Sequence, residues 1–215
     1  MLFLFKEVTL KDESKMQRIN ASFDYRKATQ ALNHFALKEG GQINKMKALK
    51  LVYLADRYHL RKYGRLITND VYFAMPYGAV ASGVKDIAED SAFLGTRVKK
   101  YSSHYLFPKK SRQLKSANPP DTDVFSESDI EALNFAWDKF GHLNQFELSR
   151  LIHNYPEWAK HKQALKLNSR VQMDLSDFFN DPITNIEKCF ALTAEDKSVR
   201  REQLEEISCL ESLWS

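Results

Sequence analysis

The sequence predicts a mainly α-helical protein: a compact helical domain with a small antiparallel β element and a helical C-terminal extension. Apolar residues recur at helical spacing between helix start and stop signals, whereas one short aromatic stretch has the composition of a strand. A length of 215 residues suits one well-buried domain with tails. We therefore expect an N-terminal extension at 1–22, a helical domain at 23–165 and a C-terminal extension at 166–215.

The first helix is expected from Asp24 to Lys38. One apolar stripe at helical spacing marks its buried side, formed by Ala28, Ala31, Leu32, Phe35 and Ala36. The pair Gly40-Gly41 then ends the helix, because glycine adopts the backbone conformations that helix termini require.

A second helix is expected from Asn44 to Tyr63, with Asn44 as the N-cap. Its apolar residues surround much of the circumference, so it should be the central helix of the domain. Lys50, Arg57 and Arg61 are seven and four residues apart, so they share one face and predict a cationic stripe.

The segment from Val71 to Met75 is short, aromatic and followed by Pro76, which predicts a strand or extended segment. Its partner strand is expected from 97–101 or from 104–107. Gly78 is interpreted as supplying backbone freedom at the bend after the strand.

Alternation along that strand sends Tyr72 and Ala74 to one face and Phe73 and Met75 to the other. Aromatic and methionine side chains fill cores, but they also anchor interfaces. We favour a core position for Phe73 and Met75, and leave Tyr72 and Tyr77 open between core and contact surface.

The chain from Pro108 to Asp123 is polar and proline-rich, which predicts an exposed loop. Further helices follow from recognisable signals: Ser126 to Gly141, Asn144 or Gln145 to Ile152, a start at Asp181-Pro182, and Glu195 to Leu213. Pro156 ends the second of these, and Trp158 is expected to anchor the helix after it.

Composition indicates a cytoplasmic protein without cofactor or metal. The net charge is only +4 and its cations are interspersed with acids, so nucleic-acid binding is permitted but not indicated. Two cysteines are too few for a disulfide framework, and six histidines show no metal-ligand spacing. No nucleotide-binding glycine loop occurs, and no apolar run is long enough for a signal peptide or a membrane span.

Asp56 and His59 are the candidate catalytic pair, since residues three apart on a helix can meet. We favour a structural network that also includes Tyr63 and Gly64 and positions the turn from Tyr63 to Asp70. Charges in an apolar helix are normally paired, because an unpaired buried charge costs several kcal/mol. The protein is accordingly expected not to be an enzyme.

Four stretches in order resemble the Panacea domain, the family of SocA-like antitoxins of bacteria and phages. They are FDYRKATQALNHFA, KALKLVYLADRYHLRKYGRLITND, YFAMPYGAV and LSRLIHNYPEW, and the resemblance spans about residues 23–160. Ala79 departs from it, because these proteins generally carry proline after the Tyr-Gly pair.

The resemblance implies an antitoxin that neutralises a cognate toxin, encoded nearby, by direct binding. The expected contact residues are Arg57, Arg61, Tyr72, Tyr77, Gly78 and Ser82. Some relatives also deliver the toxin to a protease. The last helix is expected to dock on the domain, with a partner groove or self-association as the alternative.

Two rival functions stay open at this stage. A nucleic-acid-binding regulator would use Lys99, Lys100, Lys109, Lys110, Arg112 and Lys115 as phosphate contacts. An enzyme would use Asp56 and His59, and it requires a pocket that joins them to Tyr77 or His153.

Overall fold

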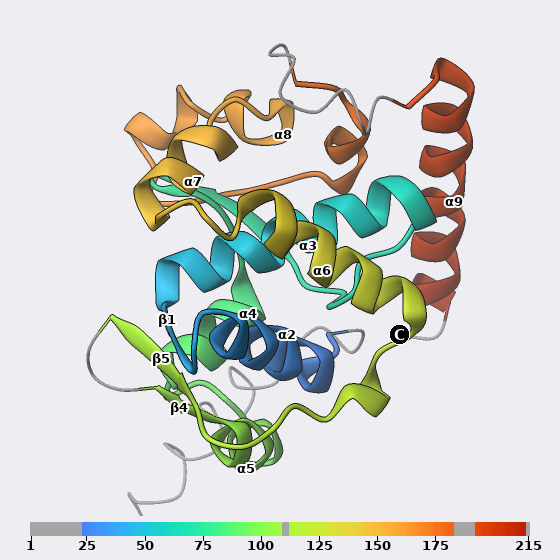
Figure 1. Ribbon diagram of the computed structural model, residues 1–215. Coiled ribbons are helices and arrows are strands. Elements are labelled where there is room, and N and C mark those ends of the chain that lie inside the picture. Colours follow the sequence, from blue (N-terminus) through green and yellow to red (C-terminus); the bar gives the residue numbers. More distant parts are fainter. Residues whose placement is uncertain (1–22, 109–111, 183–191, 214–215) are drawn as a thin grey trace, which may run out of the picture.

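The computed structural model describes residues 23–108, 112–182 and 192–213 (Figure 1). It is mainly helical with two small antiparallel sheets, so the predicted fold class is confirmed. The extension predicted at 1–22 lies outside the described residues.

Two helices form the first half of the core. α2 (Tyr25–Lys38) begins at Asp24, whose carboxylate accepts hydrogen bonds from the amides of Arg26 and Lys27. α3 (Lys45–Tyr63) begins at the predicted cap Asn44, and Gly64 ends it in the left-handed conformation at φ 76°. α3 is buried along almost its entire length, with α6 (Glu127–Phe140) beside it (Figure 1). It is therefore the central helix, as its sequence predicts.

The first sheet is a hairpin with a third, distant strand. β2 (Tyr72–Met75) pairs with β3 (Gly78–Ala81) and with β6 (Val171–Gln172), all antiparallel. The expected partner strands were wrong. The stretch 97–101 lies in α5 (Thr96–Tyr105), and 104–107 runs from α5 into the second sheet.

A tight turn after β2 explains why its partner strand is the next segment of the chain. Met75 pairs with Gly78, so only Pro76 and Tyr77 form the loop, and Gly78 adopts φ 112°. A residue with a Cβ rarely adopts this conformation, which explains glycine at the position. The chain therefore returns at once to pair with itself, and α4 (Ser82–Glu89) follows β3 directly.

The core position favoured for Phe73 and Met75 is wrong, and Tyr72, which the sequence left open, lies in the core. Tyr72 and Ala74 are buried, whereas Phe73 and Met75 are only half-buried. α3 and the C-terminal segment cover the Tyr72 side, where the ring of Phe178 meets the ring of Tyr72.

The second sheet has the order β1-β5-β4, formed by β1 (Gln42–Asn44), β5 (Gln113–Ser116) and β4 (Leu106–Pro108). The stretch predicted as a loop at 108–123 thus contains a strand. Leu114 of β5 is fully buried and faces Ile43 across the ladder. This side chain ties the stretch to the core, which its polar composition concealed.

The second half of the chain adds short helices. Capping boxes at Ser126 and Asn144 begin α6 and α7 (Gln145–Ile152), as predicted. α8 (Pro156–Ala159) has proline at its first position, and Trp158 within it is buried. The described residues of this part also contain three 3₁₀ turns, η1 (Thr122–Val124), η2 (Ala164–Lys166) and η3 (Leu175–Phe179).

The hydrophobic core continues past the boundary expected at 165. Phe178 and Phe179 are fully buried in the same core cluster as α3, and β6 completes the first sheet. α9 (Ala194–Leu213) then runs along one side of the molecule (Figure 1). The helix start expected at Asp181-Pro182 leads into 183–191, which lies outside the described residues.

Candidate partner-binding site

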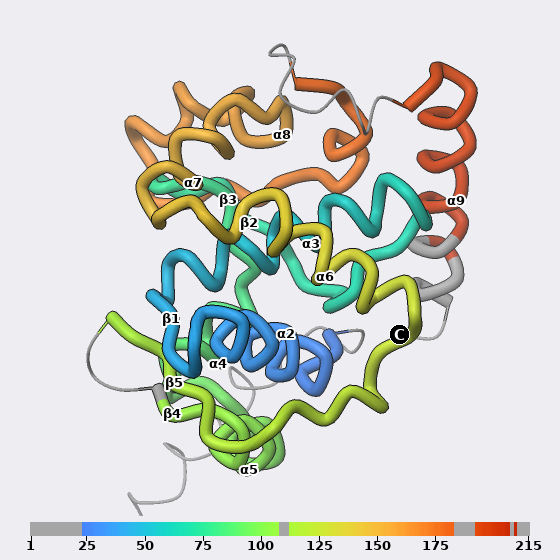
Figure 2. The backbone as a smooth tube through the Cα atoms, viewed as in Figure 1, coloured from blue at the N-terminus to red at the C-terminus, as the bar shows by residue number. Residues whose placement is uncertain are grey.

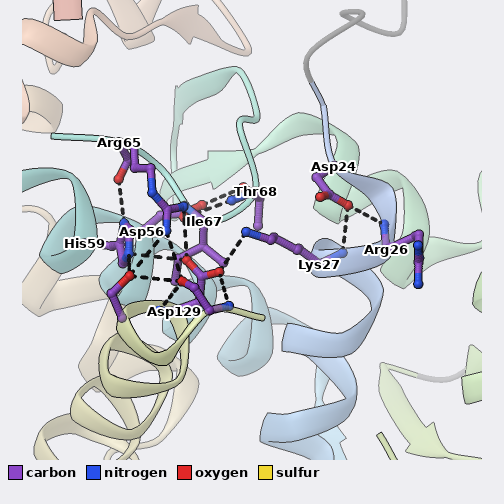
Figure 3. Close-up of polar contacts among 11 residues, drawn as sticks. Asp24, Arg26, Lys27, Asp56, His59, Arg65, Ile67, Thr68 and Asp129 are labelled. Carbon is purple, nitrogen blue, oxygen red and sulfur yellow. Dashed lines mark hydrogen bonds and ion pairs between the residues drawn. The ribbon is translucent and has the colours of Figure 1, made fainter. Parts of the chain in front are cut away.

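The carboxylate of Asp56 fixes the segment that follows α3. It accepts hydrogen bonds from the amide of Ile67 at 2.6 Å, from the amide and hydroxyl of Thr68 at 3.2 and 2.6 Å, and from the Tyr72 hydroxyl at 2.6 Å. Burial raises the pKa of Asp56, and these four donors oppose the rise. The turn before β2 is thereby bound to the middle of α3 (Figure 3).

His59, one turn further along α3, faces a different set of partners. Its Nδ1 lies 2.7 Å from the carbonyl oxygen of Arg65, so this nitrogen carries the proton and donates it. Its Nε2 lies 3.0 Å from the Ser128 hydroxyl and 3.3 Å from the carboxylate of Asp129. Burial is the largest influence on this imidazole and lowers its pKa.

Asp129 joins three helices at this point (Figure 3). It is fully buried in α6, and it accepts a hydrogen bond from Lys27 Nζ of α2 at 2.7 Å and lies 3.2 Å from Arg65 Nη1. Burial alone would raise the pKa of Asp129, but the donors from Lys27 and Ser126 outweigh it, so the pKa lies below its usual value.

Asp56 and His59 therefore do not provide an accessible catalytic pair. Both side chains are 0% exposed, and both bind main-chain groups of the turn after α3. Of the other two expected network members, the Tyr63 hydroxyl donates to Glu131, and Gly64 supplies the left-handed end of α3. The arrangement holds helices together and offers no surface to a substrate.

Arg57 and Arg61 require a correction. They share one face of α3 as expected, but each is only 2% exposed, so the expected cationic stripe lies in the interior. Arg57 Nε donates to Glu157 Oε1 at 2.6 Å, and the Tyr53 hydroxyl donates to the same oxygen at 2.6 Å. The Arg57 guanidinium also lies 4.2 Å from the centre of the Tyr155 ring.

The C-terminal segment covers this face, which is the physical reason for the burial. Arg61 Nη1 donates to the carbonyl oxygens of Phe178 at 2.8 Å and Asn180 at 3.0 Å, and Nη2 donates to Asp181 at 2.5 Å. α9 joins the same cluster, because Lys197 binds Asp181 and Arg201 donates to Asn180 Oδ1 at 2.9 Å. The two arginines thus fasten the C-terminal segment to the core.

Tyr77 has the opposite environment. It lies at the tip of the β2–β3 hairpin with 67% of its surface exposed, and the hairpin runs beside α7 (Figure 2). Its carbonyl oxygen accepts hydrogen bonds from Lys50 Nζ and, at 2.8 Å, from the Ser149 hydroxyl. Trp158 Nε1 donates to the carbonyl of Met75 at 2.9 Å. Three side chains beneath the turn therefore fix the main chain that presents this aromatic ring.

Lys50 is unusual among these three. Its side chain is 1% exposed, and burial lowers the pKa of the ammonium to about 8. A Cβ added at Gly78 would lie 2.8 Å from Lys50 Nζ and 3.3 Å from Ile152 Cγ2. Gly78 is therefore required both by its backbone conformation and by the close approach of α3 and α7.

Of the six expected contact residues, Tyr77 is exposed and Ser82, at the start of α4, is half-buried. The others, Arg57, Arg61, Tyr72 and Gly78, are buried. The expectation that these four residues lie on the surface is therefore wrong. The amides after Ser82 are held by Asp70, whose pKa burial raises to about 6.

Phe146 is a surface residue that the sequence reasoning missed. It is 51% exposed in α7, one turn before Ser149, the residue that binds the Tyr77 carbonyl. Helical periodicity could have found it, since Phe146 lies two positions from the buried Leu148, about 200° around the helix.

A metal site and a membrane-spanning helix find no support in the described residues. No group of three or more His, Cys, Asp or Glu side chains there is arranged to hold a metal ion. Within the same ranges, no helix has both the length and the apolar character needed to cross a membrane.

The fold is thus a helical domain with an outward-facing hairpin tip, and its family can be assigned. The model of the antitoxin SocA-like, Panacea domain family matches residues 49–159, from α3 to α8, which is more than half of the chain. The protein belongs to this family. No curated protein and no solved structure matches the chain.

Proposed function

We propose that this protein is the antitoxin of a toxin–antitoxin pair, and that it neutralises its toxin in the cytoplasm by direct binding. Membership in the SocA-like family supports a toxin–antitoxin role. The partner is a toxic protein encoded next to this chain. Delivery to a protease and self-association remain expectations from the sequence.

The exposed tip of the β2–β3 hairpin supports the location of the contact. Exposed aromatic side chains are the commonest energetic anchors of protein interfaces. Tyr77 is such a residue on a main chain already fixed by Lys50 and Ser149, so little conformational entropy is lost when a partner binds it. Phe146 on the adjoining helix α7 extends the contact. We place the centre of the toxin-binding surface at these two aromatic residues.

The mechanism is steric and stoichiometric: the bound antitoxin covers the toxin surface that does the damage. This requires a complex of defined ratio and no turnover. In this mechanism the buried polar networks around Asp56 and Arg57 only keep the domain rigid and do not contact the toxin.

Co-expression with the neighbouring gene tests the proposal. The wild-type chain should restore growth and co-purify with the neighbour in a fixed ratio. The double variant Tyr77→Ala, Phe146→Ala should lose both effects. Phe93→Ala is the matched control, because Phe93 is also an exposed aromatic residue, 75% exposed, in the turn between α4 and α5. Rescue without a complex would refute direct binding.

A further inference from the structure

The acidic residues of this chain are unevenly distributed. Between Asp90 and Asp121, residues 91–120 contain no Asp or Glu but seven Lys and Arg. The segment carries +7 while the whole chain carries +4, so the remainder is net negative at −3. Cations are interspersed with acidic residues in the rest of the chain, as the sequence analysis states, but not in residues 91–120.

The structure describes 91–108 and 112–120 of this segment, and the fold gathers these residues into one surface made of α5, β4 and β5. The backbone amide of Ala117 donates to the carbonyl of Tyr105 at 2.8 Å, and Asn118 Nδ2 donates to the carbonyl of His104 at 2.5 Å. The end of the helix and the end of the strand are therefore joined. In Figure 1 they lie together below α2, away from α7 and α8.

The outward side of α5 consists of hydrogen-bond donors. Val98 and Ser102 face inward and are buried. The exposed residues of the helix are Thr96, Arg97, Lys100, Ser103 and His104. On the hairpin, the exposed Lys115 of β5 lies directly opposite Phe107 of β4, which is 56% exposed. The surface therefore presents cations and hydroxyls along a helix about 15 Å long.

These cations are little neutralised by the protein itself. Lys99 has only a long contact of 3.9 Å to Asp90, at the edge of the surface. Within the ranges that the structure describes, Lys100, Arg112 and Lys115 have no ion pair. A concentration of unpaired positive charge attracts polyanions and speeds their association.

We propose that the surface formed by the described residues of α5, β4 and β5, with Arg112 just before β5, binds the phosphate backbone of duplex DNA. Arginine, lysine and hydroxyl side chains are the groups that contact DNA phosphates without reading bases. Binding to a single strand would use successive exposed aromatic platforms. Of the described Phe, Tyr and Trp side chains in α5, β4 and β5 only Phe107 is exposed, and the exposed Phe93 lies on a separate element, the turn before α5. A membrane-binding helix inserts its apolar side, whereas α5 turns that side toward α2.

DNA binding would use a different surface from toxin binding, because Tyr77 is in the turn between β2 and β3, and these strands lie beside α7, away from α5 (Figure 2). The antitoxin can therefore hold a toxin at one surface and DNA at the other. Contacts to phosphates alone give affinity with little sequence preference.

The test uses the full chain and a fluorescently labelled DNA duplex of about 30 base pairs, with binding followed by anisotropy between about 50 and 200 mM salt. The variant Lys100→Gln, Arg112→Gln, Lys115→Gln removes three cations from the surface. Its matched control, Lys38→Gln, Lys139→Gln, Lys166→Gln, removes three exposed cations elsewhere and gives the same net charge. Thermal unfolding verifies that both variants fold like the wild type.

The wild type should bind the duplex with an affinity that falls steeply with salt. The surface variant should lose on the order of tenfold in affinity at low salt, and its salt slope should fall by about one per cation removed. The control should stay within about twofold of the wild type. Equal losses in both variants, no binding at about 50 mM salt, or binding only to single strands or to phosphatidylserine vesicles would overturn the proposal.

Discussion

Two parts of the molecule that were expected at one contact surface have opposite environments. Arg57 and Arg61 of α3 are each 2% exposed, whereas Tyr77 at the hairpin tip is 67% exposed. The later chain explains the difference, since the segment ending at Asp181 covers the arginines and leaves the tip open. Charged residues in a motif can thus assemble the interior, while one aromatic residue of the same motif faces outward.

Removal of a buried carboxylate should have the largest effect on stability. Glu157→Ala leaves the Arg57 guanidinium and the Tyr53 hydroxyl without their shared acceptor, and we expect a loss of about 3–5 kcal/mol. Denaturant unfolding measures it. Glu89→Ala is the control, because Glu89 pairs with Lys85 one turn away on the surface of α4 and such pairs contribute less than about 1 kcal/mol. Similar losses in both variants would contradict the distinction between interior and surface.

The buried ammonium of Lys50 should make stability depend on pH. Burial lowers its pKa from 10.5 to about 8, so the unfolded chain holds this proton more tightly than the folded one. Burying the charged ammonium destabilises the folded protein fully below about pH 8, and this destabilisation disappears as the pH rises to about 10.5. The free energy of unfolding should therefore increase by up to about 3 kcal/mol across this range.

The unfolding free energy of the wild type minus that of Lys50→Met isolates this gain, because titrations common to both proteins cancel. The difference should move in favour of the wild type between about pH 8 and 10.5. If it does not change with pH, the ammonium is not held in a desolvated site.

A methyl group at Gly78 should have a smaller effect that reaches the hairpin tip. Gly78→Ala adds backbone strain at φ 112° and crowds Lys50 and Ile152, for an expected loss of about 1–3 kcal/mol. Gly41→Ala is the control, because Gly41 has φ 97° with nothing within 4 Å of the added carbon. Comparison of the two unfolding free energies separates strain from crowding, and crowding is absent if the losses are equal.

The sequence predicts the helices because their signals are local. Asn44, Ser126 and Asn144 cap helices through amides two or three residues away, so a short window contains both partners. The sequence does not predict the hairpin, because a proline after Met75 is typical of a strand end, whereas Pro76 and Tyr77 form a two-residue turn back to Gly78.

The burial of the arginines could not be predicted in the same way. Arg61 binds Phe178 and Asp181, which lie more than a hundred residues later in the chain. The periodicity of α3 does not distinguish a charged residue that a distant segment buries from one that faces water. The exposure of Tyr77 is equally hard to predict from the sequence, because it depends on hydrogen bonds from α7 and α8, which hold the turn from the inner side.

The most direct test of the account is the affinity of the purified chain for the protein encoded beside it, measured by calorimetry for the wild type, Tyr77→Ala and Phe93→Ala. We predict a stoichiometric complex that Tyr77→Ala weakens by about 30-fold or more, about 2 kcal/mol, with Phe93→Ala unchanged. Equal affinities for the wild type and Tyr77→Ala would show that the hairpin tip is not the toxin-binding surface.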